Sequence, residues 1–270
     1  MEFFTSEKIT DNITRIRDVC GVFVYLIEGN AQACLLDTGD GFGNLREYVA
    51  SLCKKPYIVL LTHGHIDHAS GAGLFDEVYM NHADLDIVKQ HTAIPFRVEH
   101  AKEDDFLKEL ALEDYNPIYT KDYIPLFDGQ VFDLGGIHIR AITTPGHTPG
   151  MTMFLIEEER IILFGDGCGQ KVLLFDDDSS NVQEYLQSLE KIKKIEPLYD
   201  RIIRNHTTGE SPKELLDNVM LCAKQILTHS DAREKTIFAN VTLYSAKELN
   251  EQQFPKDGSE GNILYREDKV

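Results

Sequence analysis

The sequence lacks long apolar runs. Its longer uninterrupted apolar stretches, such as Val22–Ile27 and Ile161–Phe164, are far shorter than the ~20 residues that a membrane-spanning helix needs. The first residues, Met1–Phe4, contain neither a basic segment nor a long apolar one, so we expect no signal peptide. The chain is therefore expected to be a cytoplasmic protein that neither crosses nor binds a membrane.

Basic residues are scarce. The chain carries 27 Lys and Arg against 45 Asp and Glu, which gives a formal net charge of −18. A surface this acidic repels phosphate backbones, so nucleic acid is not an expected partner. We expect a small-molecule substrate instead, and a homo-oligomer remains possible.

Cysteine is also sparse. The 5 cysteines are widely spaced and odd in number, and none forms a Cys-x-x-Cys pair. This pattern fits reduced thiols of a cytoplasmic protein better than a disulfide framework.

Apolar runs alternate with segments of helical periodicity, and this alternation predicts a layered α/β fold. The predicted strands are Val22–Ile27, Ala33–Leu36, Tyr57–Leu61, Ile137–Ile142, Met151–Ile156, Arg160–Phe164 and Arg201–Arg204. The predicted helices are Leu45–Leu52, Val182–Ile195 and a segment from Pro212 to about Leu227.

The chain shows no repeat and no low-complexity linker, so a single domain over residues 1–270 is predicted. Residues 82–125 form a polar, largely helical excursion with an acidic cluster, Glu103–Asp105. This segment either lies over a functional site or is an ordinary surface helix pair. A C-terminal extension follows residue 207, and from Thr236 it is expected to mix a short strand with a helix and polar turns.

Four metal-binding side chains occur within one short segment, His63-Gly-His-Ile-Asp-His68. Only a tight loop can turn them toward one centre, because an extended strand sends neighbouring side chains to opposite faces. The segment directly follows the apolar strand that ends at Leu61-Thr62. Ligands of α/β proteins bind at such strand ends, so we expect a metal site here.

Three further candidates also follow predicted strands. His147 comes after Ile137–Ile142, Asp166 after Arg160–Phe164, and His206 after the strand at Arg201. Imidazole and carboxylate ligands together suit zinc first, and then iron, manganese or cobalt.

The complete H-x-H-x-D-H motif, followed by His147 in Thr-Pro-Gly-His, Asp166 in Phe-Gly-Asp and then His206, resembles the metallo-β-lactamase superfamily. Asp37 in Leu-Asp-Thr-Gly matches the early motif of that family. The resemblance spans roughly residues 20–207. It implies an αββα sandwich with the site at one edge of the two sheets.

The resemblance also implies a role for each residue. Two divalent transition-metal ions would share the site, the first held by His63, His65 and His147, the second by Asp67, His68 and His206, with Asp166 bridging both. Asp37 would orient a ligand through a hydrogen bond. Such ions lower the pKa of a shared water toward ~7, and the resulting hydroxide is the nucleophile. Asp67, which orients this hydroxide, and Asp166 are the expected catalytic carboxylates.

Other candidate ligands are expected to have structural roles. Cys168 lies two residues after Asp166 and is predicted to be a neighbour of the site without a metal role. The remaining histidines are predicted to be surface or packing residues, and they are His82, His91, His100, His138 and His229.

The same resemblance narrows the range of expected reactions. Lactone-cleaving relatives carry a tyrosine where this chain has Gly169, whereas Gly167-Cys168-Gly169 is similar to a motif of thioester-cleaving glyoxalase II relatives. We expect hydrolysis of a small ester, thioester, lactone or amide. The alternatives are an oxidoreductase similar to the mononuclear iron persulfide dioxygenases, a phosphodiesterase acting on a small substrate, and a non-enzymatic metal-binding module.

Overall fold

The computed structural model describes residues 2–102, 107–238 and 241–270. These residues form two compact units. Unit 1 contains the chain up to Arg140 together with Asn205–Thr207, and unit 2 contains Ala141–Arg204 and Thr208–Val270. The single domain expected from the sequence stays a prediction, and the acidic cluster Glu103–Asp105 lies outside the described residues.

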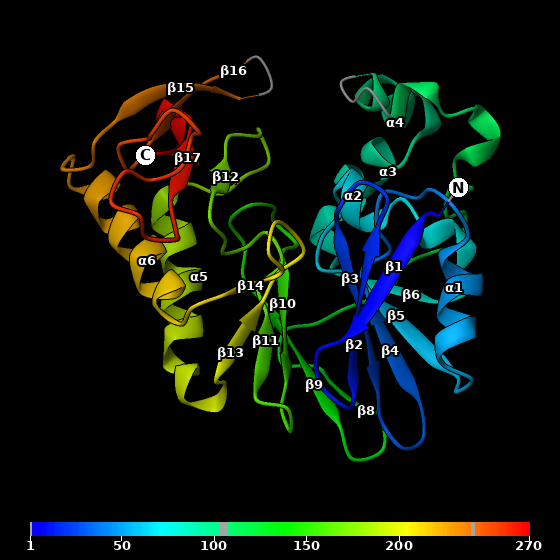
Figure 1. Ribbon diagram of the computed structural model, residues 1–270. Coiled ribbons are helices and arrows are strands. Elements are labelled where there is room, and N and C mark those ends of the chain that lie inside the picture. Colours follow the sequence, from blue (N-terminus) through cyan, green and yellow to red (C-terminus); the bar gives the residue numbers. More distant parts are fainter. Residues whose placement is uncertain (1, 103–106, 239–240) are drawn as a thin grey trace. The chain divides into compact units, whose positions relative to one another are not determined.

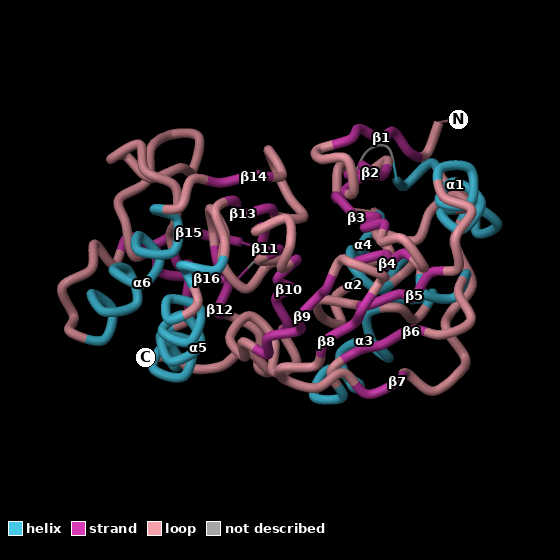
Figure 2. The backbone as a smooth tube through the Cα atoms, turned by 90° about the horizontal axis from the view of Figure 1, so that it is seen from below, coloured by secondary structure: helices cyan, strands magenta, loops and turns pink. Residues whose placement is uncertain are grey.

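Unit 1 is built on a sheet whose strands follow the chain order from β1 to β7 (Figure 1). Strands β1 to β4 pair antiparallel, and β4 to β7 pair parallel. Figure 2 shows β3 to β7 side by side in this order. The strands are β1 (Phe4–Lys8), β2 (Ile13–Asp18), β3 (Phe23–Glu28), β4 (Ala33–Leu36), β5 (Tyr57–Leu60), β6 (Val78–Met80) and β7 (Ile124–Pro125).

The apolar patterns of unit 1 explain its core. Every residue of β4, and all of β3 except Glu28, are buried, as expected for strands that are covered on both faces. Helix α1 (Leu45–Leu52) buries Leu45 and Val49, which are four residues apart and so share one face. The Asn44 side chain accepts a hydrogen bond from the Glu47 amide and thereby caps this helix.

The described residues that follow β6, 82–102 and 107–125, contain five short helical segments up to Asp114. The buried Arg97 of this segment donates hydrogen bonds to the carbonyls of Asp40, Gly41 and Asn116. It thereby holds the glycine-rich loop after β4. The remaining elements of unit 1 are α2 (Ile66–Ala69), η1 (Ala72–Leu74), η2 (His82–Asp84), α3 (Leu85–His91), α4 (Ile94–Ala101), η3 (Leu107–Glu109), η4 (Leu112–Asp114), β8 (Val131–Asp133) and the first half of β9 (His138–Thr143), which pairs with β8 and whose last three residues belong to unit 2.

Unit 2 contains strands in the order β14-β13-β11-β10 and a four-stranded sheet in the order β12-β17-β16-β15. Helices α5 and α6 lie side by side (Figure 1) and contribute Leu189 and Val219 to its hydrophobic core. The elements are β10 (Thr152–Ile156), β11 (Ile161–Leu163), β12 (Val172–Leu174), α5 (Val182–Lys194), η5 (Glu196–Leu198), β13 (Arg201–Ile203), β14 (Glu210–Ser211), α6 (Glu214–Leu227), β15 (Glu234–Phe238), β16 (Val241–Ser245), β17 (Ile263–Tyr265) and η6 (Glu267–Lys269).

The C-terminal extension corrects one expectation. The sequence predicted a short strand and a helix there, but the described residues after Leu227 contain three strands and only a short 3₁₀ turn, Glu267–Lys269. The predicted helix is wrong because the intervening polar segment is broken by Pro255, Gly258 and Gly261. Its apolar residues pair in a sheet instead, with β17 between β16 and β12.

None of the helices in the described part of the chain is both long enough and apolar enough to span a membrane.

Candidate metal centre

The histidine-rich motif forms the loop between β5 and α2. His65 occupies the N-cap position of α2, so Asp67 and His68 lie in the first turn of that helix. The Gly64 amide donates to Oδ2 of the buried Asp84 at 3.0 Å. A Cβ atom at Gly64 would lie 3.0 Å from the Val88 amide nitrogen and 3.1 Å from the Asp84 carbonyl oxygen. Glycine is therefore favoured here, because a side chain at this position would be tight against the Asp84 and Val88 backbone.

Asp37 is the centre of a buried hydrogen-bond network behind this loop. Its carboxylate accepts from the Thr62 amide at 2.7 Å, from the Thr62 hydroxyl at 2.8 Å and from Asn205 Nδ2 at 2.9 Å. His68 Nδ1 lies 2.9 Å from Asp37 Oδ2. Asp37 is fully buried and has a φ of +64°, in a region where aspartate is enriched among non-glycine residues.

These contacts determine which ring nitrogen of each histidine carries a proton. A carboxylate only accepts, so His68 Nδ1 donates to Asp37. The single hydroxyl proton of Thr62 also goes to Asp37, and His63 Nδ1, at 3.0 Å from Thr62 Oγ1, therefore donates to that oxygen. In both rings the Nε2 atom is then left with its lone pair, which is the form that binds a metal ion.

Three side chains of unit 1 converge on one point. Asp67 Oδ2 lies 3.4 Å from His68 Nε2 and 3.2 Å from His206 Nε2. Ligand atoms of His63 and His65 also lie within 4.8 Å of each other.

The spacing fits a zinc ion. Two ligand atoms at tetrahedral positions, each about 2.1 Å from one zinc ion, lie about 3.4 Å apart. The distances from Asp67 Oδ2 to His68 Nε2 and to His206 Nε2 match this separation. The donor set of imidazole nitrogens and one carboxylate is also the set that zinc prefers.

Unit 2 carries the other two predicted ligands on neighbouring loops. His147 Nδ1 lies 2.9 Å from the Leu173 carbonyl oxygen and donates to it, which again leaves Nε2 with its lone pair, the form that can bind a metal ion. His147 Nε2 lies 3.8 Å from Asp166 Oδ2. These are the residues of the Thr-Pro-Gly-His and Phe-Gly-Asp motifs, and their side chains face each other within unit 2.

Two residues that orient Asp37 were not identified from the sequence. Thr62 lies directly before the motif and Asn205 directly before His206, and both donate to Asp37. Their position beside a predicted ligand was the only available signal. Asn205 also pairs with Phe23 of β3, since its carbonyl accepts from the Phe23 amide and its Nδ2 donates to the Phe23 carbonyl. His206 is thereby held against the sheet of unit 1.

The other histidines and Cys168 have different surroundings. His82, His100 and His229 are exposed, whereas the His91 ring stacks on His65 with centroids 4.8 Å apart and on Phe96 at 4.5 Å. The Cys168 side chain is buried in the core of unit 2, and this burial raises the pKa of its thiol.

Comparisons with known proteins identify the family. Residues 17–199 match the metallo-beta-lactamase superfamily, and the chain belongs to this superfamily. A relative from Bacillus velezensis, named "Probable polyketide biosynthesis zinc-dependent hydrolase BaeB", is 27% identical over 60% of this chain and 61% of its own length. The chain thus spans about three fifths of that relative. The human "Acyl-coenzyme A thioesterase MBLAC2" is 23% identical over 68% of this chain and 72% of its own length.

Solved structures agree on the fold. A metallo-beta-lactamase from Pontibacter korlensis superposes with a TM-score of 0.60 at 14% sequence identity, over 82% of this chain and 99% of the other. The chain therefore has the α/β metallo-beta-lactamase fold that the sequence motifs predicted.

Proposed function

We propose that this protein is a two-metal hydrolase that cleaves a small thioester. The observation that carries this proposal is the set of contacts around Asp37, which directs Nε2 of His68 toward Asp67 and His206 at the spacing of a zinc site. The thioester class is supported by the printed name of the human relative and by the Gly167-Cys168-Gly169 sequence after Asp166. An ester, lactone or amide remains within the same reaction class.

The ligand assignment in this proposal follows the order of the family motifs. His63, His65 and His147 would hold one ion, Asp67, His68 and His206 would hold the other, and Asp166 would bind both. Two zinc ions in such a site supply Lewis acidity, which polarises the scissile carbonyl and acidifies a shared water.

The protein's own groups prepare the ligands. Thr62 and Asp37 hold the protons of His63 and His68 on Nδ1, so neither ring has to change tautomer before it binds a metal ion. Asp67 is ionised at neutral pH, as an aspartate ordinarily is, and its Oδ2 lies near Nε2 of both His68 and His206, where it can bind a cation and orient a water molecule.

A comparison of two histidine variants tests the proposal. His206→Ala should reduce the metal content from two equivalents to one and lower thioester turnover by orders of magnitude, because metal-assisted activation contributes several kcal/mol and each ~1.4 kcal/mol changes the rate tenfold. His229→Ala, at an exposed position, should change neither. The readouts are elemental analysis and release of free thiol from an acyl-coenzyme A substrate.

The same variant distinguishes the proposed hydrolase from the alternative oxidoreductase. In a mononuclear iron oxidoreductase, His206→Ala would keep one iron ion and most of its persulfide-dependent oxygen consumption. That result, together with no thiol release by the wild-type protein, would contradict the two-metal hydrolase.

A further inference from the structure

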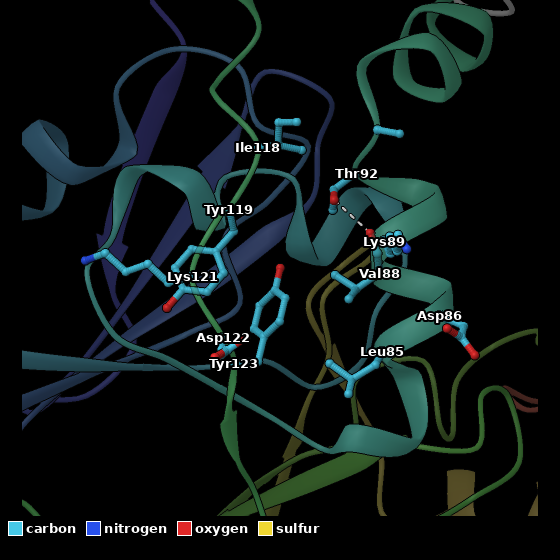
Figure 3. A pocket seen from close by; sticks show the side chains of 11 residues that line it. Leu85, Asp86, Val88, Lys89, Thr92, Ile118, Tyr119, Lys121, Asp122 and Tyr123 are labelled. Atoms are coloured by element: carbon cyan, nitrogen blue, oxygen red, sulfur yellow. Dashed lines mark hydrogen bonds between the residues drawn. The ribbon is translucent and has the colours of Figure 1, made fainter.

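Unit 1 contains a cavity that the metal chemistry does not use. It lies between α3 and the extended segment 118–123, and its volume is about 360 Å³ (Figure 3). Ligand pockets in proteins usually range from ~300 to ~1,000 Å³ and are mostly apolar with a few polar groups. The size therefore suits one small molecule.

Apolar side chains form one part of the wall of this cavity. Leu85 and Val88 of α3 lie across from Ile118 and Tyr123 of the extended segment (Figure 3). Leu85 and Ile118 are 38% and 46% exposed, although both are large apolar side chains. A ligand that covers them would remove this apolar surface from water, which is favourable.

One polar group points into the cavity. The Tyr123 hydroxyl is directed into the space between its own segment and α3 (Figure 3), and within the described part of the chain it has no hydrogen-bond partner. Burial raises the pKa of Tyr123, so the hydroxyl keeps its proton and acts as a donor. The neighbouring Tyr119, whose ring centroid lies 4.6 Å away, instead donates to the Asp76 carbonyl.

The charges around the cavity balance. Lys89 and Lys121 line it together with Asp86 and Asp122. Lys121 is paired with Asp76 at 3.0 Å, so it is not available as a strong anion-binding group. The net charge of the whole chain, −18, also disfavours an anionic ligand.

From these observations we propose that the cavity is a binding site for a small neutral molecule with an apolar body and one carbonyl-type acceptor. The body packs against Leu85, Val88 and Ile118, and the acceptor receives the hydrogen bond of Tyr123. This site goes beyond the proposed hydrolase function and does not depend on it.

The site lies behind the histidine loop, with α3 between them. One face of α3 lines the cavity through Leu85 and Val88, whereas Asp84 at its N-terminus and His91 at its end contact Gly64 and His65. An α-helix is about 10 Å wide, so a bound ligand is one helix away from the histidine loop and is a second ligand rather than the reacting group.

Acetophenone is a suitable probe because it combines an aromatic ring with one carbonyl oxygen. Its binding is followed by NMR of the protein with ¹³C-labelled tyrosine, and the Tyr123 signal is assigned as the one missing from Tyr123→Phe. We expect acetophenone to shift the ring signals of Tyr123 and Tyr119 in a saturable way. Tyr123→Phe should weaken its binding about 3- to 10-fold, the range of one neutral hydrogen bond.

Three controls make the test specific. Tyr119→Phe should leave the affinity unchanged, because that hydroxyl is already bonded to Asp76. Ethylbenzene, which lacks the acceptor, should bind wild type and Tyr123→Phe equally. Ala93→Leu, which narrows the cavity, should abolish binding while the circular dichroism spectrum stays that of the folded protein.

Several results would overturn the assignment. Unshifted Tyr123 signals up to the solubility limit of acetophenone would exclude the site. An equal loss of affinity in Tyr119→Phe would remove the role of the Tyr123 donor, and tighter binding of benzoate than of acetophenone would show that the site prefers anions. None of these measurements uses turnover or metal content, so the hydrolase proposal is tested separately.

Discussion

Asp37→Asn is the substitution that probes the centre of the hydrogen-bond network. The two residues have nearly the same shape, and asparagine also tolerates the φ of +64° at this position. The change therefore replaces one carboxylate oxygen by an NH₂ group without adding backbone strain. Wild-type Asp37 accepts from Thr62, from Asn205 and from His68.

Both orientations of the new amide disturb the network. If its NH₂ group faces the Thr62 amide, two donors meet across a distance that is 2.7 Å in the wild type. If it faces His68, Nδ1 must become an acceptor, and the ring proton moves to Nε2, the ligand atom. Loss of such an orienting partner reduces metal affinity or activity about 10- to 100-fold.

Competition with a fluorescent zinc chelator measures this change. We expect Asp37→Asn to bind at least one zinc ion about 10- to 100-fold more weakly and to lose turnover in proportion. Asp76→Asn is the matched control, because Asp76 is an exposed carboxylate paired with Arg46 and Lys121. An Asp37→Asn protein that folds and binds both ions like the wild type would refute the orienting role of Asp37.

Three further predictions follow from single contacts. Cys168→Ser should leave the metal content unchanged because the thiol lies in the core of unit 2, and a drop measured by elemental analysis would make Cys168 a ligand. His91→Ala should weaken zinc binding in the chelator assay, whereas His91→Phe should retain it by keeping the stack on His65; equal effects of both variants would exclude the stacking role. Burial, and then the charge of Asp18, raise the pKa of Asp40 well above its ordinary value. The folded state therefore holds this proton more tightly, and its stability falls as the pH rises above the unfolded pKa of ~3.9. Asp40→Asn should then raise the melting temperature near pH 7 but not near pH 4, and an equal gain at both values would contradict this reasoning.

The buried strands and the cluster of candidate metal ligands were the features most accessible from the sequence. β3 and β4 are apolar along nearly their whole length, so a local pattern was sufficient to predict them. The candidate ligands of H-x-H-x-D-H are neighbours in the chain, so a local pattern also singled them out. β1 was missed because it is an edge strand with only Phe4 buried, and its polar residues carry no alternating pattern. β17 was missed because it is three residues long and its partners, β12 and β16, come from distant parts of the chain.

The residues that orient the ligands could not be predicted in the same way. Asn205 lies 168 positions after Asp37 in the chain, and apart from its place directly before His206 nothing in its local sequence indicates this contact. The contact depends on β3, because the Phe23 backbone holds Asn205 from both sides. Tyr123 is a similar case, since the cavity that its hydroxyl faces exists only when α3 is packed across from its segment.

The Asp37 network also explains why a ligand motif alone does not define a metal site. A histidine can carry its proton on either ring nitrogen, and only one of these forms presents Nε2 to a metal ion. Here Thr62 and Asp37 select that form for His63 and His68, and Asn205 supplies a further donor that keeps Asp37 an acceptor. A chain with the same H-x-H-x-D-H motif but no carboxylate at the end of β4 would have to reorganise its histidines before binding. The aspartate of Leu-Asp-Thr-Gly is therefore as informative about metal binding as the ligands themselves.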